Sequence, residues 1–79
     1  MAKTFTYEVT KHIGTIAESG AMTTELNLIS FLGAPAKFDL RRWRTKEDGS
    51  RSMQKGCTLT AEELIALRDL LNSMEDIDG

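Results

Sequence analysis

Along the first part of the chain, polar positions alternate with positions that are mostly apolar. Residues 4–13 follow a period of two and are rich in β-branched and aromatic side chains, which predicts a strand with one buried face. Ser19-Gly20 then offers a turn. The alternation resumes at Met22 and predicts a second strand that ends before Gly33-Ala34-Pro35, because proline lacks an amide hydrogen and glycine readily adopts turn conformations.

A third strand is expected over residues 36–44. Phe38 and Leu40 point to one side of it, and a charged and aromatic set points to the other, namely Lys37, Asp39, Arg41 and Trp43. Residues 45–52 are polar throughout and contain an Asp-Gly pair, which predicts a loop. A fourth strand is expected over residues 53–59.

The segment that follows predicts a helix. Thr60 and Glu63 have the spacing of a capping box, in which each side chain accepts a hydrogen bond from the backbone amide of the other residue. Apolar residues then recur at helical spacing as far as Met74. We expect the helix to end near Met74 and residues 75–79 to form a frayed acidic tail.

Together these segments predict one α+β domain over residues 1–79, with a curved four-stranded antiparallel β-sheet followed by a C-terminal α-helix. One helix can close one face of such a sheet, which leaves the other face to solvent, a partner subunit or a ligand. Cys57 has no second cysteine to pair with, and Cys57 and His12 together are too few ligands for a structural zinc. Oligomerisation is the remaining support for so small a domain, and Cys57 is expected to be buried.

The charges are distributed unevenly. The net charge of −2 by itself argues against a nucleic-acid-binding protein. Between Lys37 and Lys55, however, there are seven basic residues and three acidic ones, and most other acidic residues follow Thr60. This asymmetry predicts a basic surface that faces a polyanion, with a solvated loop as the alternative. The sequence shows no apolar run that could cross a bilayer and no signal peptide, so we expect a cytoplasmic protein without membrane contact.

No motif in the sequence indicates catalysis. Phosphate-binding glycine loops, Gly-x-Ser-x-Gly and His-Glu-x-x-His do not occur. His12 is expected at the surface rather than as a general base, and Glu62 and Glu63 are explained by helix capping and the helix dipole. We therefore expect a protein that is not an enzyme and that uses no metal or small-molecule cofactor.

Candidate nucleic-acid-binding residues gather on the third strand. Lys37, Arg41 and Trp43 share one face, and Lys55 on the fourth strand is expected to come near them. Single-strand binding requires cations that follow the phosphates and aromatic side chains on which bases stack. The alternative for Trp43 is a core or dimer-interface anchor, and for Phe31 a core position. A face rich in Trp and Arg also suits a protein–protein interaction module, which is the alternative function.

Two stretches of the chain resemble the single-strand-binding domain of the positive cofactor 4 transcriptional coactivators, in particular their short bacterial YdbC-like relatives. One stretch is residues 30–43, where an aromatic and a glycine precede Asp-Leu-Arg-Arg-Trp, and the other is Lys-Gly-Cys-Thr-Leu-Thr at residues 55–60. The family pattern has Asp-Ile-Arg and Lys-Gly-Ile-Ser-Leu at these places. The resemblance covers about residues 5–74, with Leu32 and Ala34 where many relatives carry basic residues.

The resemblance implies a homodimer whose helices help to form the interface and whose sheets bind single-stranded DNA with little sequence preference. Single-stranded RNA stays open as an alternative, because nothing in the sequence reports on the 2′-hydroxyl. Transcription, replication and repair are all compatible with such a protein. The nucleic-acid-binding residues expected from the family pattern and the basic segment are Phe31, Lys37, Arg41, Trp43, Arg44 and Lys55.

Overall fold

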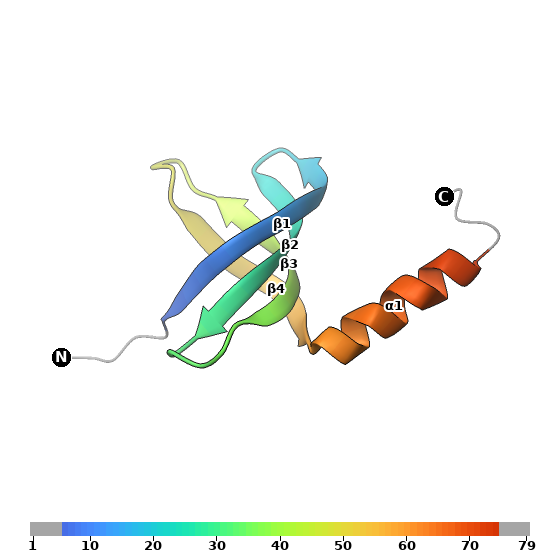
Figure 1. The fold of residues 1–79 in the computed structure, drawn as a ribbon. Coiled ribbons are helices and arrows are strands. Elements are labelled where there is room, and N and C mark those ends of the chain that lie inside the picture. Colours follow the sequence, from blue (N-terminus) through green and yellow to red (C-terminus); the bar gives the residue numbers. More distant parts are fainter. Residues whose placement is uncertain (1–5, 75–79) are drawn as a thin grey trace.

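The computed structural model describes residues 6–74. Four strands and one helix occur in the predicted order (Figure 1): β1 Tyr7–Ser19, β2 Met22–Phe31, β3 Lys37–Thr45, β4 Arg51–Leu59 and α1 Ala61–Ser73. The strands form one antiparallel sheet in the order β1-β2-β3-β4, so each strand pairs with its neighbour in sequence. The four-stranded sheet with a C-terminal helix is thus confirmed. The expected acidic tail and the start of the expected first strand lie outside the described residues.

β1 does not keep the regular alternation that its sequence predicted. Its pairing with β2 contains three register shifts, so that Val9 stands opposite Ile29 and His12 stands opposite Asn27. Residues directly opposite each other share a face of the sheet, so Val9 and His12 lie on the same face, whereas regular alternation would separate them. Irregularities of this kind bend a strand and increase its twist. They accompany the strong curvature of the sheet in Figure 1.

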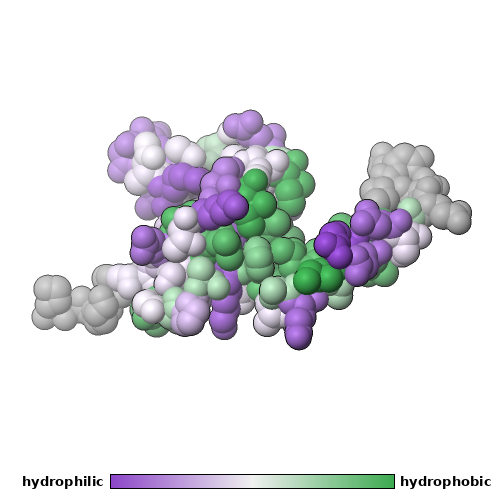
Figure 2. All heavy atoms as spheres, viewed as in Figure 1, coloured by the Kyte–Doolittle hydropathy of each residue, from purple (hydrophilic) through white to green (hydrophobic). Residues whose placement is uncertain are grey.

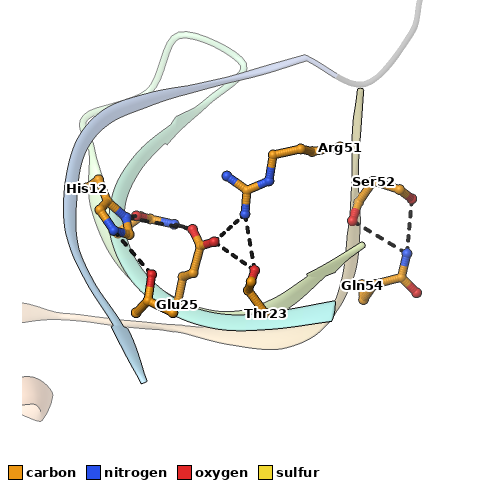
Figure 3. A network of polar contacts seen from close by, with 8 residues as sticks. His12, Thr23, Glu25, Arg51, Ser52 and Gln54 are labelled. Atoms are coloured by element: carbon orange, nitrogen blue, oxygen red, sulfur yellow. Dashed lines mark hydrogen bonds and ion pairs between the residues drawn. The ribbon is translucent and has the colours of Figure 1, made fainter. Parts of the chain in front are cut away.

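The concave face of the curved sheet holds the buried side chains, and most of them are polar. The buried residues of the described chain are Glu25, Asn27, Ile29, Asp39 and Trp43. The β2–β3 register places all of them on one face, as the alternation in these two strands predicted. We call it the inner face, because Figure 3 shows β-strands curving around side chains that lie on it. The opposite, outer face carries Leu26, Leu28, Phe38 and Leu40.

The turn between β2 and β3 contains a strained residue. Leu32 (φ 54°) and Gly33 (φ 79°) both have left-handed backbone conformations, which glycine adopts without strain and leucine does not. The Ser30 hydroxyl donates to the Ala34 carbonyl oxygen at 2.5 Å, and the Ala34 amide donates to the Phe31 carbonyl oxygen at 2.9 Å. These bonds hold the turn in this conformation.

The helix begins as predicted but does not close the sheet. Thr60 Oγ1 accepts a hydrogen bond from the Glu63 amide at 3.1 Å, and Glu63 Oε1 accepts one from the Thr60 amide at 2.9 Å, so the capping box is confirmed. From this point α1 runs away from the sheet (Figure 1), and none of its residues, all of which are described, is buried. The expectation that the helix covers one sheet face is therefore wrong. An open hollow of about 450 Å³ lies between α1 and outer-face residues such as Leu26 and Leu40.

Apolar side chains remain accessible around this hollow. Figure 2 shows them gathered over the sheet and the start of α1. Cys57, which we expected to be buried, is exposed on β4 opposite Leu40, because the helix that would have covered it points away. Within residues 6–74, no helix has the length and apolar character needed to span a membrane.

Candidate nucleic-acid interface

The predicted nucleic-acid-binding residues divide between the two faces of the sheet. Lys37, Arg41 and Trp43 lie on the inner face, as their alternation along β3 predicted. Arg44 follows Trp43 and pairs with Met22, which places it on the outer face. The inner face therefore presents two of the cationic candidates from β3, and Arg44 adds its charge on the other side.

Lys55 lies beside a close approach of β3 and β4. The β4 residue opposite Arg41 is Gly56, and a register shift separates this pair from the next one, Trp43 with Met53. Lys55 lies within that shift and is exposed. A Cβ atom on Gly56 would lie 2.6 Å from the Arg41 Cα and 2.6 Å from the Leu40 carbonyl oxygen. Only glycine allows Arg41 to lie this close to β4.

Arg41 is held by a buried carboxylate. Its Nε and Nη2 atoms donate to the two carboxylate oxygens of Asp39, each at 2.6 Å, and its Nη1 atom donates to the Gln54 carbonyl oxygen at 3.0 Å. The Asp39 side chain is fully buried and that of Arg41 is 14% exposed. The hydrogen bonds with Asp39 raise the pKa of Arg41 further and outweigh the opposite effect of burial. The guanidinium carbon lies 6.0 Å from the centre of the Phe31 ring, so a fixed cation stands beside an aromatic side chain.

Trp43 is covered, whereas Phe31 is only half-buried. Trp43 is 2% exposed; the Tyr7 ring centre lies 5.7 Å from its own, and the Arg51 guanidinium carbon lies 4.9 Å from its ring centre. Among residues 6–74, the indole Nε1 has no hydrogen-bond partner. In this conformation Trp43 is a packed residue and offers no ring face to a base. Phe31, for which a core position was the alternative, is the more accessible of the two rings.

A polar network around Glu25 occupies the inner face (Figure 3). Its member Arg51 lies over the ring of Trp43. Glu25 accepts hydrogen bonds from Thr23 Oγ1 at 2.7 Å and Asn27 Nδ2 at 3.3 Å, and it forms an ion pair with Arg51. The Asn27 Oδ1 atom lies 2.6 Å from Nδ1 of His12. Burial raises the pKa of Glu25, but the hydrogen bonds from Thr23 and Asn27 and the charge of Arg51 together bring that pKa below its ordinary value. Glu25 is therefore a buried carboxylate that stays charged at neutral pH.

Comparison with known proteins identifies the family of the chain. Residues 22–70 match the family model described as Transcriptional Coactivator p15 (PC4), and this segment contains all the predicted nucleic-acid-binding residues. The chain belongs to the PC4 family. PC4 proteins bind DNA, and the family resemblance stated from the sequence is confirmed. A protein of Treponema pallidum (strain Nichols), described as uncharacterized, is 52% identical over 71 residues, which is 89% of this chain and 80% of that protein.

Two residues of the PC4 segment stand out in the structure but were not among the predicted site residues. In the sequence, Arg51 is one charge in a polar loop, whereas in the structure it is the first residue of β4 and covers Trp43. Glu25 could have been found, because its alternation with Asn27 and Ile29 puts a charged residue on a face that also carries an apolar one. A carboxylate on a buried face must have hydrogen-bond or ion-pair partners. A glutamate at such a position therefore indicates a polar network around it.

Proposed function

We propose that this PC4-family chain is a non-catalytic protein that binds single-stranded DNA with little sequence preference. The observation that carries the proposal is Arg41, which Asp39 fixes beside Phe31 on the face that also presents Lys37. A cation that is already held in place loses little conformational freedom when it contacts a phosphate. The accessible part of Phe31 offers a surface on which a base can stack. Neither contact depends on the identity of the base, which accounts for the low sequence preference.

Three other residues extend the proposed interface. Lys55 and Arg44 are exposed, so their charges are accessible to phosphates, that of Arg44 from the outer face of the sheet. Trp43 joins them when its ring is uncovered. Membership of the bacterial YdbC-like branch stays a prediction from the sequence pattern.

Titration of a labelled oligo-dT, followed by fluorescence anisotropy at several salt concentrations, tests the proposal. We expect affinity to fall as salt rises, with a log–log slope of about −0.7 for each phosphate contacted. Lys37→Ala is expected to reduce the magnitude of this slope by about 0.7. Lys11→Ala is the matched control, because Lys11 pairs with Leu28 on the outer face. No binding at low salt, or binding that is indifferent to salt, would refute the proposal.

The contribution of stacking is tested separately at Phe31. Phe31→Leu keeps an apolar side chain but removes the ring, so we expect affinity to fall without a change in the salt slope. Base–aromatic stacking is worth about 1–3 kcal/mol per base, which corresponds to a loss of about 5-fold to 150-fold. Competition with unlabelled single-stranded DNA, RNA and duplex DNA of equal length then distinguishes the DNA proposal from the RNA alternative.

We also propose that the chain forms a homodimer through α1 and the outer face. Several large apolar side chains on β1, on α1 and at the residue that follows α1 are exposed, namely Ile16, Ile65, Leu70, Leu71 and Met74. The hollow beside α1 is also lined mostly by apolar residues. Removal of such surface from water drives association, and a helix-mediated homodimer is what the family resemblance implied.

Sedimentation velocity tests the dimer. Leu71 lines the hollow and is 44% exposed, so Leu71→Asp should give a monomer where the unmodified chain gives a dimer. Leu32 is 65% exposed in the turn after β2, and Leu32→Asp is the control that should remain dimeric. A monomeric unmodified chain at micromolar concentration would contradict the proposal.

A further inference from the structure

Arg51 covers the only tryptophan of the chain while it is bound to a buried carboxylate. Its guanidinium carbon lies 4.9 Å from the centre of the Trp43 ring. Its Nη2 atom pairs with Glu25 Oε2 and donates to Thr23 Oγ1 at 3.3 Å. The Glu25 side chain is 7% exposed, whereas that of Arg51 is 42% exposed. A fixed anion therefore holds the end of a long, partly solvated side chain over the indole.

While Arg51 covers the ring, the indole N–H of Trp43 lacks a hydrogen-bond acceptor among residues 6–74. Its Nε1 is buried and, within the described part of the chain, has no acceptor. A buried donor without an acceptor is unfavourable and is uncommon in folded proteins. An arrangement in which the indole meets an acceptor from outside would remove this defect.

We infer that Arg51 is a phosphate-binding residue of the proposed interface and that Glu25 holds it over Trp43 until nucleic acid binds. The inference rests on the proposed function. It adds Arg51 to the interface and states that Arg51 leaves Glu25 before Trp43 becomes accessible. A phosphate presents to a guanidinium the same planar pair of oxygens that a carboxylate does, so it competes directly with Glu25. Transfer of Arg51 to a phosphate moves the guanidinium off Trp43, and the ring and its Nε1 become accessible to a neighbouring base.

The surroundings of Arg51 allow this exchange. Arg51 is the first residue of the edge strand β4 and follows the turn at residues 46–50, so its backbone lies at the edge of the sheet and its side chain reaches inward over Trp43. Ion pairs that are partly exposed are weak, and an external anion can displace one partner. When Arg51 leaves, Glu25 keeps its hydrogen bonds from Thr23 and Asn27 and is not left as an unpartnered buried charge.

Intrinsic fluorescence tests the inference, because Trp43 is the only tryptophan in the sequence and its emission reports on this site alone. In the free protein we expect weak quenching by acrylamide, since Trp43 is 2% exposed. Saturation with oligo-dT should quench the emission by base stacking. Binding is measured independently by the anisotropy of a label on the oligonucleotide. If the oligonucleotide binds while Trp43 emission and acrylamide quenching stay as in the free protein, the inference is overturned and the proposed function stands. If no oligonucleotide binds, the proposed function itself fails.

Glu25→Gln tests the role of the carboxylate, because glutamine keeps the shape of Glu25 and removes its charge. We expect stronger acrylamide quenching in the free variant and an affinity for oligo-dT that rises by about threefold to fivefold, as expected for release of a weak ion pair. Glu18→Gln is the matched control, since Glu18 stands opposite Thr23 in the same pair of strands. Equal effects of the two substitutions would mean that only net charge matters and would overturn the role of Glu25.

Arg51→Ala tests the phosphate contact. This test remains valid even when the Glu25→Gln variant fails to fold. The free variant should show Trp43 more accessible to acrylamide, and its salt slope should be smaller in magnitude by about 0.7. Melting followed by circular dichroism establishes that the variant is folded. An unchanged salt slope in the folded variant would exclude Arg51 from the interface.

Discussion

Replacement of Gly56 by alanine tests whether β3 and β4 approach each other as closely as the structure indicates. An added Cβ would overlap the Cβ of Arg41 and lie 2.6 Å from the Arg41 Cα and from the Leu40 carbonyl oxygen. Two of these three neighbours are backbone atoms, so a side-chain rotation cannot relieve the overlap. The strands must separate by about 1–2 Å to bring these three contacts to an ordinary distance of about 3.5 Å. That displacement also stretches the 3.0 Å bond from Arg41 to the Gln54 carbonyl oxygen beyond hydrogen-bonding distance.

The expected loss of stability follows from the bonds that the separation breaks. Two hydrogen bonds of the β3–β4 ladder and the charged bond of Arg41 contribute about 1 kcal/mol each. We therefore expect Gly56→Ala to lower the free energy of unfolding by about 3 kcal/mol. In a domain of this size, that corresponds to a fall in Tm of about 12–24 °C.

Thermal and urea unfolding followed by circular dichroism measure this effect. Gly14→Ala is the control, because Gly14 lies in β1 and a Cβ added there meets no described atom within 4 Å. At such a site, alanine is expected to leave stability unchanged or to raise it by up to about 1 kcal/mol, since it restricts the unfolded chain. Similar melting temperatures for the two variants would refute the close approach at Gly56.

Three further predictions concern stability. Leu32→Asn should raise the free energy of unfolding in urea by about 1 kcal/mol, because asparagine tolerates the left-handed backbone better than leucine; no gain would mean that Leu32 is unstrained. Thr60→Ala should lower it by about 1 kcal/mol through loss of the cap, and an unchanged value would count against the capping box. The folded-state pKa of Glu25 lies below its ordinary value of 4.5, so its stabilising contribution is fully present above pH 4.5 and is lost as pH falls through the lower folded pKa. Urea unfolding between neutral and acidic pH should show this loss in the unmodified chain and not in Glu25→Gln, and identical pH profiles would contradict it.

The sequence predicts the elements of this fold well where the signal is local. Alternation assigns the faces of β2 and β3 correctly, because both strands pair regularly with each other and each residue keeps its side. The start of α1 follows from Thr60 and Glu63 alone, since a capping box needs only residues of the first turn.

The parts that were missed depend on contacts between distant residues. The register shifts of β1 leave no clear trace in its pattern of polarity, so regular alternation puts Val9 and His12 on opposite faces although they share one. The direction of α1 depends on what it packs against, and polarity within the helix does not contain that information. Alternation also places Trp43 on a face without indicating that the sheet curves toward that face, and so it left open whether the ring is exposed or buried.

The course of α1 links secondary structure to protein concentration. A helix of 13 residues is close to the length at which isolated helices are marginal in water, and α1 buries none of its residues against its own sheet. Its helicity therefore depends on whatever covers its apolar side, and for a second copy of the chain this coverage varies with concentration. Ellipticity at a helical wavelength, measured along a dilution series, should fall together with the fraction of the proposed homodimer. Affinities for DNA measured in dilute solution and melting curves measured in concentrated solution would then describe chains with different amounts of helix.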